Sequence, residues 1–153
     1  MLVAVDASSR AALVVRTGAE FARQFGAKLI LFRAVPIPPE FPPAAATHHA
    51  DELAPKLLAD GERELRELSS GMGNGNIEVR VVAASEPWLA IVAEADAQKV
   101  DAIVVGSHGY RLLDRILGTN AARVADRAHC VVMVVHEPVT PAAPPSSPYR
   151  KRS

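Results

Sequence analysis

Two short glycine-containing segments have residue types that suit an anion-binding site. The sequence Gly-Ser-His-Gly occupies residues 106–109, and Gly-Thr follows at residues 118–119 after eight intervening residues. Glycine lets the backbone approach a ligand closely, and free N–H groups at the start of a helix attract phosphate. Arg111 and Arg115 lie between the two segments and can add positive charge. These segments can therefore hold the phosphates of a nucleotide, with the Thr119 hydroxyl as a helix cap or a further phosphate donor.

The same glycines have a simpler interpretation, which is that they only form turns. No Gly-Lys-Ser/Thr follows them, so the segment is not a Walker phosphate loop, and the Gly-x-Gly-x-x-Gly dinucleotide fingerprint is also missing. The glycines therefore indicate phosphate binding of another kind, or turns.

Asp6 ends the first apolar run of the chain and has three interpretations. It can face a ligand, cap the following helix, or act as the phosphoacceptor of a receiver domain. A receiver domain needs further acidic residues after its first strand, an aspartate at its third strand and a lysine after its fifth. The corresponding runs here end in Ala84 and His136, which disfavours the receiver interpretation.

Five other side chains are candidates for chemistry, and each has a plainer role. His108 can act as a base, but is more often a solvated loop residue. His48 and His49 have no Cys or carboxylate at metal-ligand spacing around them, so we expect a pair of surface residues and no metal site. Cys130 is expected to be a small core residue, and Trp88 to pack on the sheet or at a dimer surface.

The elements that position these residues alternate along the chain. Short apolar runs at residues 2–5, 28–34, 77–82, 101–105 and 131–135 predict strands, and helical patterns lie between them at about residues 9–25, 49–68, 86–99 and 119–128. Ser8 or Ser9 can cap the first helix, and Gly26 ends it. This order predicts a single α/β domain with a parallel sheet covered on both faces. Ligands of such sheets bind beyond the carboxyl ends of the strands, which is where Asp6 and Gly106 lie.

Helical spacing also predicts which residues face the core. The first helix should turn inward Ala12, Val15, Ala19, Ala22 and Phe25, and the second Leu53, Leu57, Leu58, Leu65 and Leu68.

Composition places the chain among ordinary globular proteins. Its 153 residues suit one domain, and 17 basic against 17 acidic residues give a net charge of zero, which argues against a nucleic-acid binder or a surface held to acidic lipids. The single cysteine excludes an internal disulfide framework. We see no membrane-spanning run and no signal peptide, and we expect a cytoplasmic protein. The expected domain covers residues 1–137 with a Pro-rich surface loop at 36–47, and a flexible Pro-rich, basic tail covers 138–153.

The chain resembles the universal stress protein family over about residues 2–136. The resemblance is carried by Leu2-Val3-Ala4-Val5-Asp6-Ala7-Ser8, by Asp101-Ala102-Ile103-Val104-Val105-Gly106-Ser107-His108-Gly109, by Gly118-Thr119 with its helix, and by Cys130-Val131-Val132-Met133-Val134-Val135. The nucleotide-binding branch of that family has Gly-x-x-Gly, about nine residues, then Gly-Ser/Thr. Here eight residues intervene, so the chain resembles the ATP-binding branch with a departure in the loop.

The resemblance implies a Rossmann-like three-layer fold with strand order 3-2-1-4-5, ATP as the ligand, with or without Mg²⁺ or Mn²⁺, and a homodimer formed through the strand at 131–135. Asp6 would face the ribose or adenine, and backbone near Ala4, Ala34 and Val105 would line the base. The residues implied to contact the nucleotide are Ala4, Val5, Asp6, Ala34, Val105, Gly106, Ser107, His108, Gly109, Gly118, Thr119 and Asn120.

Three functions remain open at this point. The first is an ATP-binding, dimeric stress-response or regulatory module. The second is an enzyme of the adenine nucleotide α-hydrolase-like fold that slowly hydrolyses ATP or transfers a phosphoryl group, which the lack of glycine at residues 7–10 disfavours. The third is a dimeric interaction protein without a ligand.

Overall fold

A five-stranded parallel sheet organises the domain. The computed structural model describes residues 1–36, 48–72, 76–107 and 118–137. Along this part of the chain lie β1 Leu2–Ala4, α1 Ala11–Phe25, β2 Leu29–Pro36, α2 His48–Ser69, β3 Ile77–Ala84, α3 Pro87–Ala97, β4 Ala102–Gly106, α4 Thr119–Arg127 and β5 Val131–Val135. All neighbouring strands pair in parallel in the order β3-β2-β1-β4-β5. The predicted fold class and strand order are therefore confirmed.

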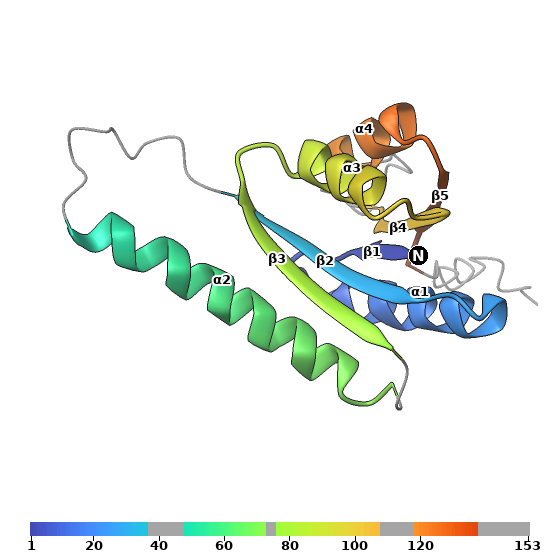
Figure 1. Cartoon of the computed structure of the whole chain (residues 1–153), viewed down its shortest axis with the longest axis horizontal. Coiled ribbons are helices and arrows are strands. Elements are labelled where there is room, and N and C mark those ends of the chain that lie inside the picture. The colour runs from blue at the N-terminus through green and yellow to red at the C-terminus, as the bar shows by residue number, and fades with distance from the viewer. Residues whose placement is uncertain (37–47, 73–75, 108–117, 138–153) are drawn as a thin grey trace, which may run out of the picture.

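Helices cover both faces of this sheet, α1 and α2 on one and α3 and α4 on the other (Figure 1). Because side chains alternate along a strand, the Leu31 side chain of β2 points to one face of the sheet and the Phe32 side chain to the other. The α1–α2 core contains Val3, Val5, Ala11, Val14, Val15, Ala22, Leu29, Leu31, Leu65 and Val104. The α3–α4 core contains Leu2, Phe32, Ile91, Val92, Ala95, Ile103, Val105, Ala121 and Val124.

β2 is longer than predicted and includes Pro36, which the sequence placed in the Pro-rich loop. β1 pairs only with residues 30–32 of β2, whereas β3 pairs with β2 as far as Pro36 opposite Ala84. The last residues of β2 thus have a paired strand on one side only. Proline, which lacks a backbone N–H, is tolerated in such an edge position. The rest of the expected loop, at 37–47, and the expected tail at 138–153 lie outside the described residues.

α1 begins later than predicted and buries a different face. Its N-cap is Arg10, and Ser8 instead closes the preceding turn, where its hydroxyl accepts the Arg10 N–H at 3.2 Å. The buried residues are Ala11, Val14, Val15, Gly18 and Ala22. The prediction was right for Val15 and Ala22, and for Ala19, which packs against the same core. It was wrong for Ala12, which is exposed, and for Phe25, which is 72% exposed. Gly26 ends the helix as predicted, in the left-handed conformation with φ of 60°.

Among its described side chains, α2 packs on the sheet mainly through the second half of the helix. Leu65 is fully buried and Leu68 packs against the same core, as predicted, and Leu58 is half-buried. Leu57 is 39% exposed, so its predicted inward position is wrong, and the side chain of Leu53 is outside the described part. Among the described residues, no helix is long and apolar enough to cross a membrane.

Gly18 sets how closely α1 lies on the sheet. A Cβ at this position would come within 2.4 Å of Val3 Cγ2 on β1, a distance that forces something to shift. We expect Gly18→Val to lower the free energy of unfolding by about 2 kcal/mol, because the overpacking cost of about 1–3 kcal/mol exceeds any gain in helix propensity. Urea unfolding measures this change.

The matched control is Gly71→Val. A Cβ on Gly71 meets no atom of the described chain within 4 Å. Its effect should stay within about 0.5 kcal/mol. Equal stabilities for the two variants would show that α1 can move away from β1 at little cost.

Candidate functional site

The carboxyl ends of β1, β2 and β4 meet at one edge of the sheet. Ala4 pairs with Phe32 on one side and with Val105 on the other, and the Val5 N–H donates to the Phe32 carbonyl at 2.8 Å. Ala4 and Ala34 both pack against the α3–α4 core, of which Val105 is a member. The three residues implied to line the base therefore share one face of the sheet.

Asp6 begins a compact turn after β1. One of its carboxylate oxygens, Oδ1, accepts the Ser8 backbone N–H at 3.1 Å and the Ser8 hydroxyl at 2.6 Å. The Ser8 hydroxyl oxygen in turn accepts the N–H of Arg10, the residue that caps α1. This arrangement fixes the exposed Asp6 side chain at the carboxyl edge of the sheet.

The end of β4 lies next to this turn. Gly106 is the last residue of β4, and a Cβ there would stand 3.0 Å from Val14 Cγ2 of α1. The next residue, Ser107, donates its N–H to the Val135 carbonyl at 2.8 Å and accepts Arg10 Nη1 on its own carbonyl at 3.0 Å. Arg10 thus links the start of α1 to the first glycine segment across 97 residues of sequence.

The second glycine segment begins α4. Gly118 is the buried N-cap with φ of −58° and ψ of 149°, and its carbonyl accepts the Ala122 N–H at 2.8 Å. Thr119 and Asn120 are exposed, while Ala121 belongs to the α3–α4 core together with Val105. The first N–H groups of a helix have no partner within the helix, so this turn can present donors to an anion.

Not every predicted site residue can be placed. His108 and Gly109 lie outside the described residues, as do Arg111 and Arg115 between the glycine segments. Among the residues that the structure describes, no three His, Cys, Asp or Glu side chains gather as a metal site.

Two arginines at this edge were not predicted from the sequence. Arg10 pairs through Nε with Glu137 at 2.9 Å, besides its bond to Ser107. Arg33 is 6% exposed and binds the backbone after β1. A single charge inside the apolar run of β2 was the available signal for Arg33. The signal for Arg10 is spatial, since its partners lie at the other end of the chain.

Trp88 packs against the core as predicted, whereas Cys130, predicted to be a core residue, is only partly buried. Both pack against the α3–α4 core, and burial is the main cause that raises the pKa of the Cys130 thiol. The Arg123 guanidinium lies 5.6 Å from the centre of the Trp88 ring. In the described part of the chain, Trp88 Nε1 is a buried donor without a hydrogen-bond partner.

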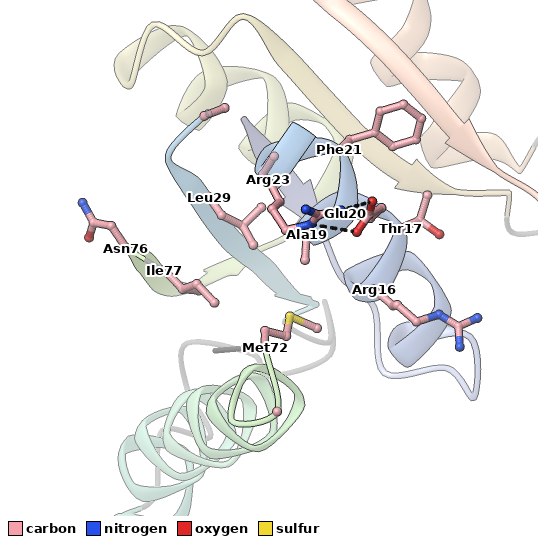
Figure 2. Close-up of a pocket in the computed structure, with 13 residues that line it drawn as sticks. Arg16, Thr17, Ala19, Glu20, Phe21, Arg23, Leu29, Met72, Asn76 and Ile77 are labelled. Atoms are coloured by element: carbon pink, nitrogen blue, oxygen red, sulfur yellow. Dashed lines mark hydrogen bonds and ion pairs between the residues drawn. The ribbon is translucent and has the colours of Figure 1, made fainter. Parts of the chain in front are cut away.

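A hollow of about 780 Å³ lies at the other end of the sheet, between the end of α1, the start of β2 and β3, and residues after α2. Its middle is lined by apolar side chains such as Leu29, Met72 and Ile77. Figure 2 shows the Arg16 guanidinium and the Asn76 amide pointing away from it. Arg23 and Glu20 pair with each other at 2.6 Å. Its polar groups do not converge, so the candidate site is the carboxyl edge, where Asp6, Arg10 and the described residues of the glycine segments lie.

Comparison with known sequences identifies a family. The sequence profile of the universal stress protein family matches residues 1–136. The chain belongs to the universal stress protein family. A universal stress protein of Methanocaldococcus jannaschii is 26% identical over 140 residues, which are 90% of this chain and 82% of that protein.

Solved universal stress proteins share the fold. UspA of Lactobacillus plantarum superposes with a TM-score of 0.76 at 23% identity, covering 88% of this chain and 94% of that one. A universal stress protein in complex with cAMP has a TM-score of 0.65 at 29% identity, with 89% and 97% covered. The universal stress protein of Archaeoglobus fulgidus in complex with dAMP has a TM-score of 0.56 at 25% identity, with 87% and 94% covered. Two of these three relatives thus hold an adenine nucleotide.

Proposed function

We propose that this universal stress protein binds an adenine nucleotide, ATP in particular, at the carboxyl ends of β1 and β4 and serves as a regulatory module in stress response. The base would lie by Ala4, Ala34 and Val105, and Asp6 would contact the ribose or adenine. Val5 belongs to the same edge. Gly106, Ser107, Gly118, Thr119 and Asn120 would hold ribose and phosphates, together with His108 and Gly109 of the glycine motif.

The observation that carries this proposal is that one sheet edge gathers the Asp6 turn, the end of β4 and the start of α4 at its N-cap Gly118. Val105 and Ala121, one residue before Gly106 and one after Asn120, belong to the same core. Close backbone approach and helix N–H groups suit phosphate, and the small apolar residues Ala4, Ala34 and Val105 suit a base. The cAMP and dAMP complexes of relatives support the adenine part of the proposal.

Titration calorimetry with ATP, ADP, AMP and adenosine tests this function, with and without Mg²⁺ or Mn²⁺. We expect saturable binding of ATP. A lack of heat up to about 1 mM, a limit of about 4 kcal/mol of binding, would contradict the proposal. Identification of the nucleotide released on denaturing the purified protein gives a second, independent answer.

The nucleotide is expected to be held rather than turned over quickly. The groups that this edge brings together are binding groups, namely backbone N–H donors, hydroxyls and Arg10, while the Asp6 carboxylate already accepts two bonds from Ser8. Fast phosphoryl transfer also needs a positioned base or water-holder. Phosphate release from ATP should therefore be slower than about 1 per second, below the common enzyme value of about 10 per second.

His108→Ala is the variant that decides between module and enzyme. Release faster than about 1 per second in the wild type, lost in the variant with binding intact, would favour the α-hydrolase-like enzyme. Slow release in both proteins favours the regulatory module.

A homodimer through β5 completes the proposal. β5 is an edge strand of the sheet, and Val131 at its start is 62% exposed. Such an edge can pair with a second copy. Light scattering after size exclusion should give about twice the chain mass of 16.3 kDa.

Val131→Lys should shift this dimer toward the monomer, whereas Val132 and Val134 pack against the α3–α4 core and are unsuitable for the test. Phe25→Lys is the matched control, since Phe25 is 72% exposed at the end of α1. A monomer at all concentrations would exclude a dimer. An equal loss of dimer in both variants would exclude β5 as its interface.

A further inference from the structure

Arg33 is a charged residue in the interior of an apolar strand. It is 6% exposed and points to the α1–α2 face of β2, where Leu29 and Leu31 are core residues. Burying a charge is unfavourable unless it is paired and hydrogen-bonded. The hydrogen-bond partners of Arg33 therefore indicate which part of the structure this residue holds in place.

The guanidinium of Arg33 donates two hydrogen bonds to the backbone directly after β1. Nε donates to the Val5 carbonyl at 3.3 Å, and Nη2 donates to the Asp6 carbonyl at 3.0 Å. These two carbonyls belong to the residues that begin the turn at the site edge. Arg33 thus fixes the backbone of the residue whose carboxylate would meet the nucleotide.

The third bond of Arg33 leads to α2. Nη1 donates to a Glu64 carboxylate oxygen at 2.5 Å. Gly61, one turn earlier, lets α2 come close, because a Cβ there would lie 3.2 Å from Val81 Cγ1 and 3.6 Å from Arg33 Cδ. α2 is thereby held over the aliphatic part of Arg33.

A series of hydrogen-bonded residues joins α2 to Ser107 in the first glycine segment. It runs from Glu64 through Arg33 to the Asp6 backbone, and from the Asp6 carboxylate to Ser8. Ser8 then accepts the Arg10 N–H, and Arg10 reaches the Ser107 carbonyl. The Glu64–Arg33 and Asp6–Ser8 bonds join two side chains, and the other bonds join a side chain to backbone. A shift of Arg33 is therefore expected to displace the Asp6 turn.

We propose that Arg33 is a positioning residue for nucleotide binding, which holds the Asp6 turn in its binding geometry and is itself oriented by Glu64 of α2. The change in ATP affinity that this inference predicts rests on the proposed function. The arrangement of the turn is a separate property that can be measured without any ligand.

The test compares Arg33→Met with Arg33→Lys and with the control Arg80→Met. Arg80 lies on the neighbouring strand β3 and bridges Glu78 and Glu94, away from the β1 turn. We expect Arg33→Met to weaken ATP binding at least tenfold in calorimetry. Lysine can still donate to one carbonyl and should restore most of the affinity. Arg80→Met should change affinity less than twofold, although it can lower stability.

Backbone NMR relaxation of residues 6–8 is the second readout. In Arg33→Met we expect order parameters to fall from about 0.85 toward 0.6, while Arg80→Met leaves them unchanged. Glu64→Gln should reduce affinity by threefold or less, because the Glu64 side chain is 50% exposed. If Arg33→Met does not fold, Arg33→Gln, which is shorter and carries no charge, serves for the same two measurements, and a wild-type affinity together with a wild-type turn in that variant would overturn the proposal.

The outcomes separate this inference from the proposed function. If the wild type binds no nucleotide, the proposed function is wrong. The relaxation data on residues 6–8 then still test whether Arg33 orders the Asp6 turn. If the wild type binds and Arg33→Met keeps its affinity and its ordered turn, Arg33 is not a positioning residue. An equal loss of affinity in Arg80→Met would show a general effect of stability and would also overturn the inference.

Discussion

Gly118→Val is expected to abolish nucleotide binding while the domain stays folded. Gly118 is the buried N-cap of α4, and its φ of −58° and ψ of 149° are open to any residue, so valine creates no backbone strain. Its branched side chain instead fills the space where the backbone would approach a phosphate. ATP affinity should fall at least 100-fold, about 2.7 kcal/mol, in calorimetry.

Two further variants make this result specific. Gly118→Ala should lie between valine and wild type if the available space decides the affinity. Gly71→Val adds the same side chain at an open position, with no atom of the described chain within 4 Å of the added Cβ, and should bind ATP as the wild type does. Normal binding by Gly118→Val would mean that the start of α4 does not contact the ligand.

The sequence predicted the order of elements because the strands are short apolar runs between helical patterns. β5 has the predicted bounds, Val131–Val135, and β4 differs by one residue at each end. The inward face of α1 was harder to predict. Its N-cap is Arg10 rather than Ser8 or Ser9, and its buried residues include Val14 and Gly18. Ala12 and Phe25 keep helical spacing but lie on the exposed side of that stripe.

The candidate site was predictable as far as it follows strand ends. Asp6, Val105 and Gly106 come directly after or at the end of buried runs, and parallel strands bring those ends together. Arg10 and Arg33 could not be found this way. Their roles depend on backbone carbonyls, Val5 and Asp6 for Arg33 and Ser107 for Arg10. Carbonyls carry no residue-type signal, so only the folded arrangement reveals these contacts.

Arg10→Gln is expected to weaken binding of nucleotides but not of adenosine. The Arg10 guanidinium bonds to the Ser107 carbonyl beside Gly106, so its positive charge lies where the proposed site would hold phosphates. Glutamine can keep a hydrogen bond to that carbonyl but carries no charge. A charge-assisted bond contributes about 1.5–3 kcal/mol, so ATP affinity should fall about 10–100-fold, measured by calorimetry at low salt.

Adenosine has no phosphate, so its binding separates the effect of the Arg10 charge from any structural role of Arg10. If Arg10 acts through its charge, adenosine affinity stays unchanged, and the loss for ATP shrinks as salt screens the wild-type attraction. Glu137→Gln removes the carboxylate that pairs with Arg10 at 2.9 Å and should raise ATP affinity a few-fold. Arg16→Gln, an exposed arginine further along α1, is the matched control for lost charge. A similar loss for adenosine and ATP would mean that Arg10 only holds the end of β4 against α1, because a contact of that kind does not depend on the phosphate.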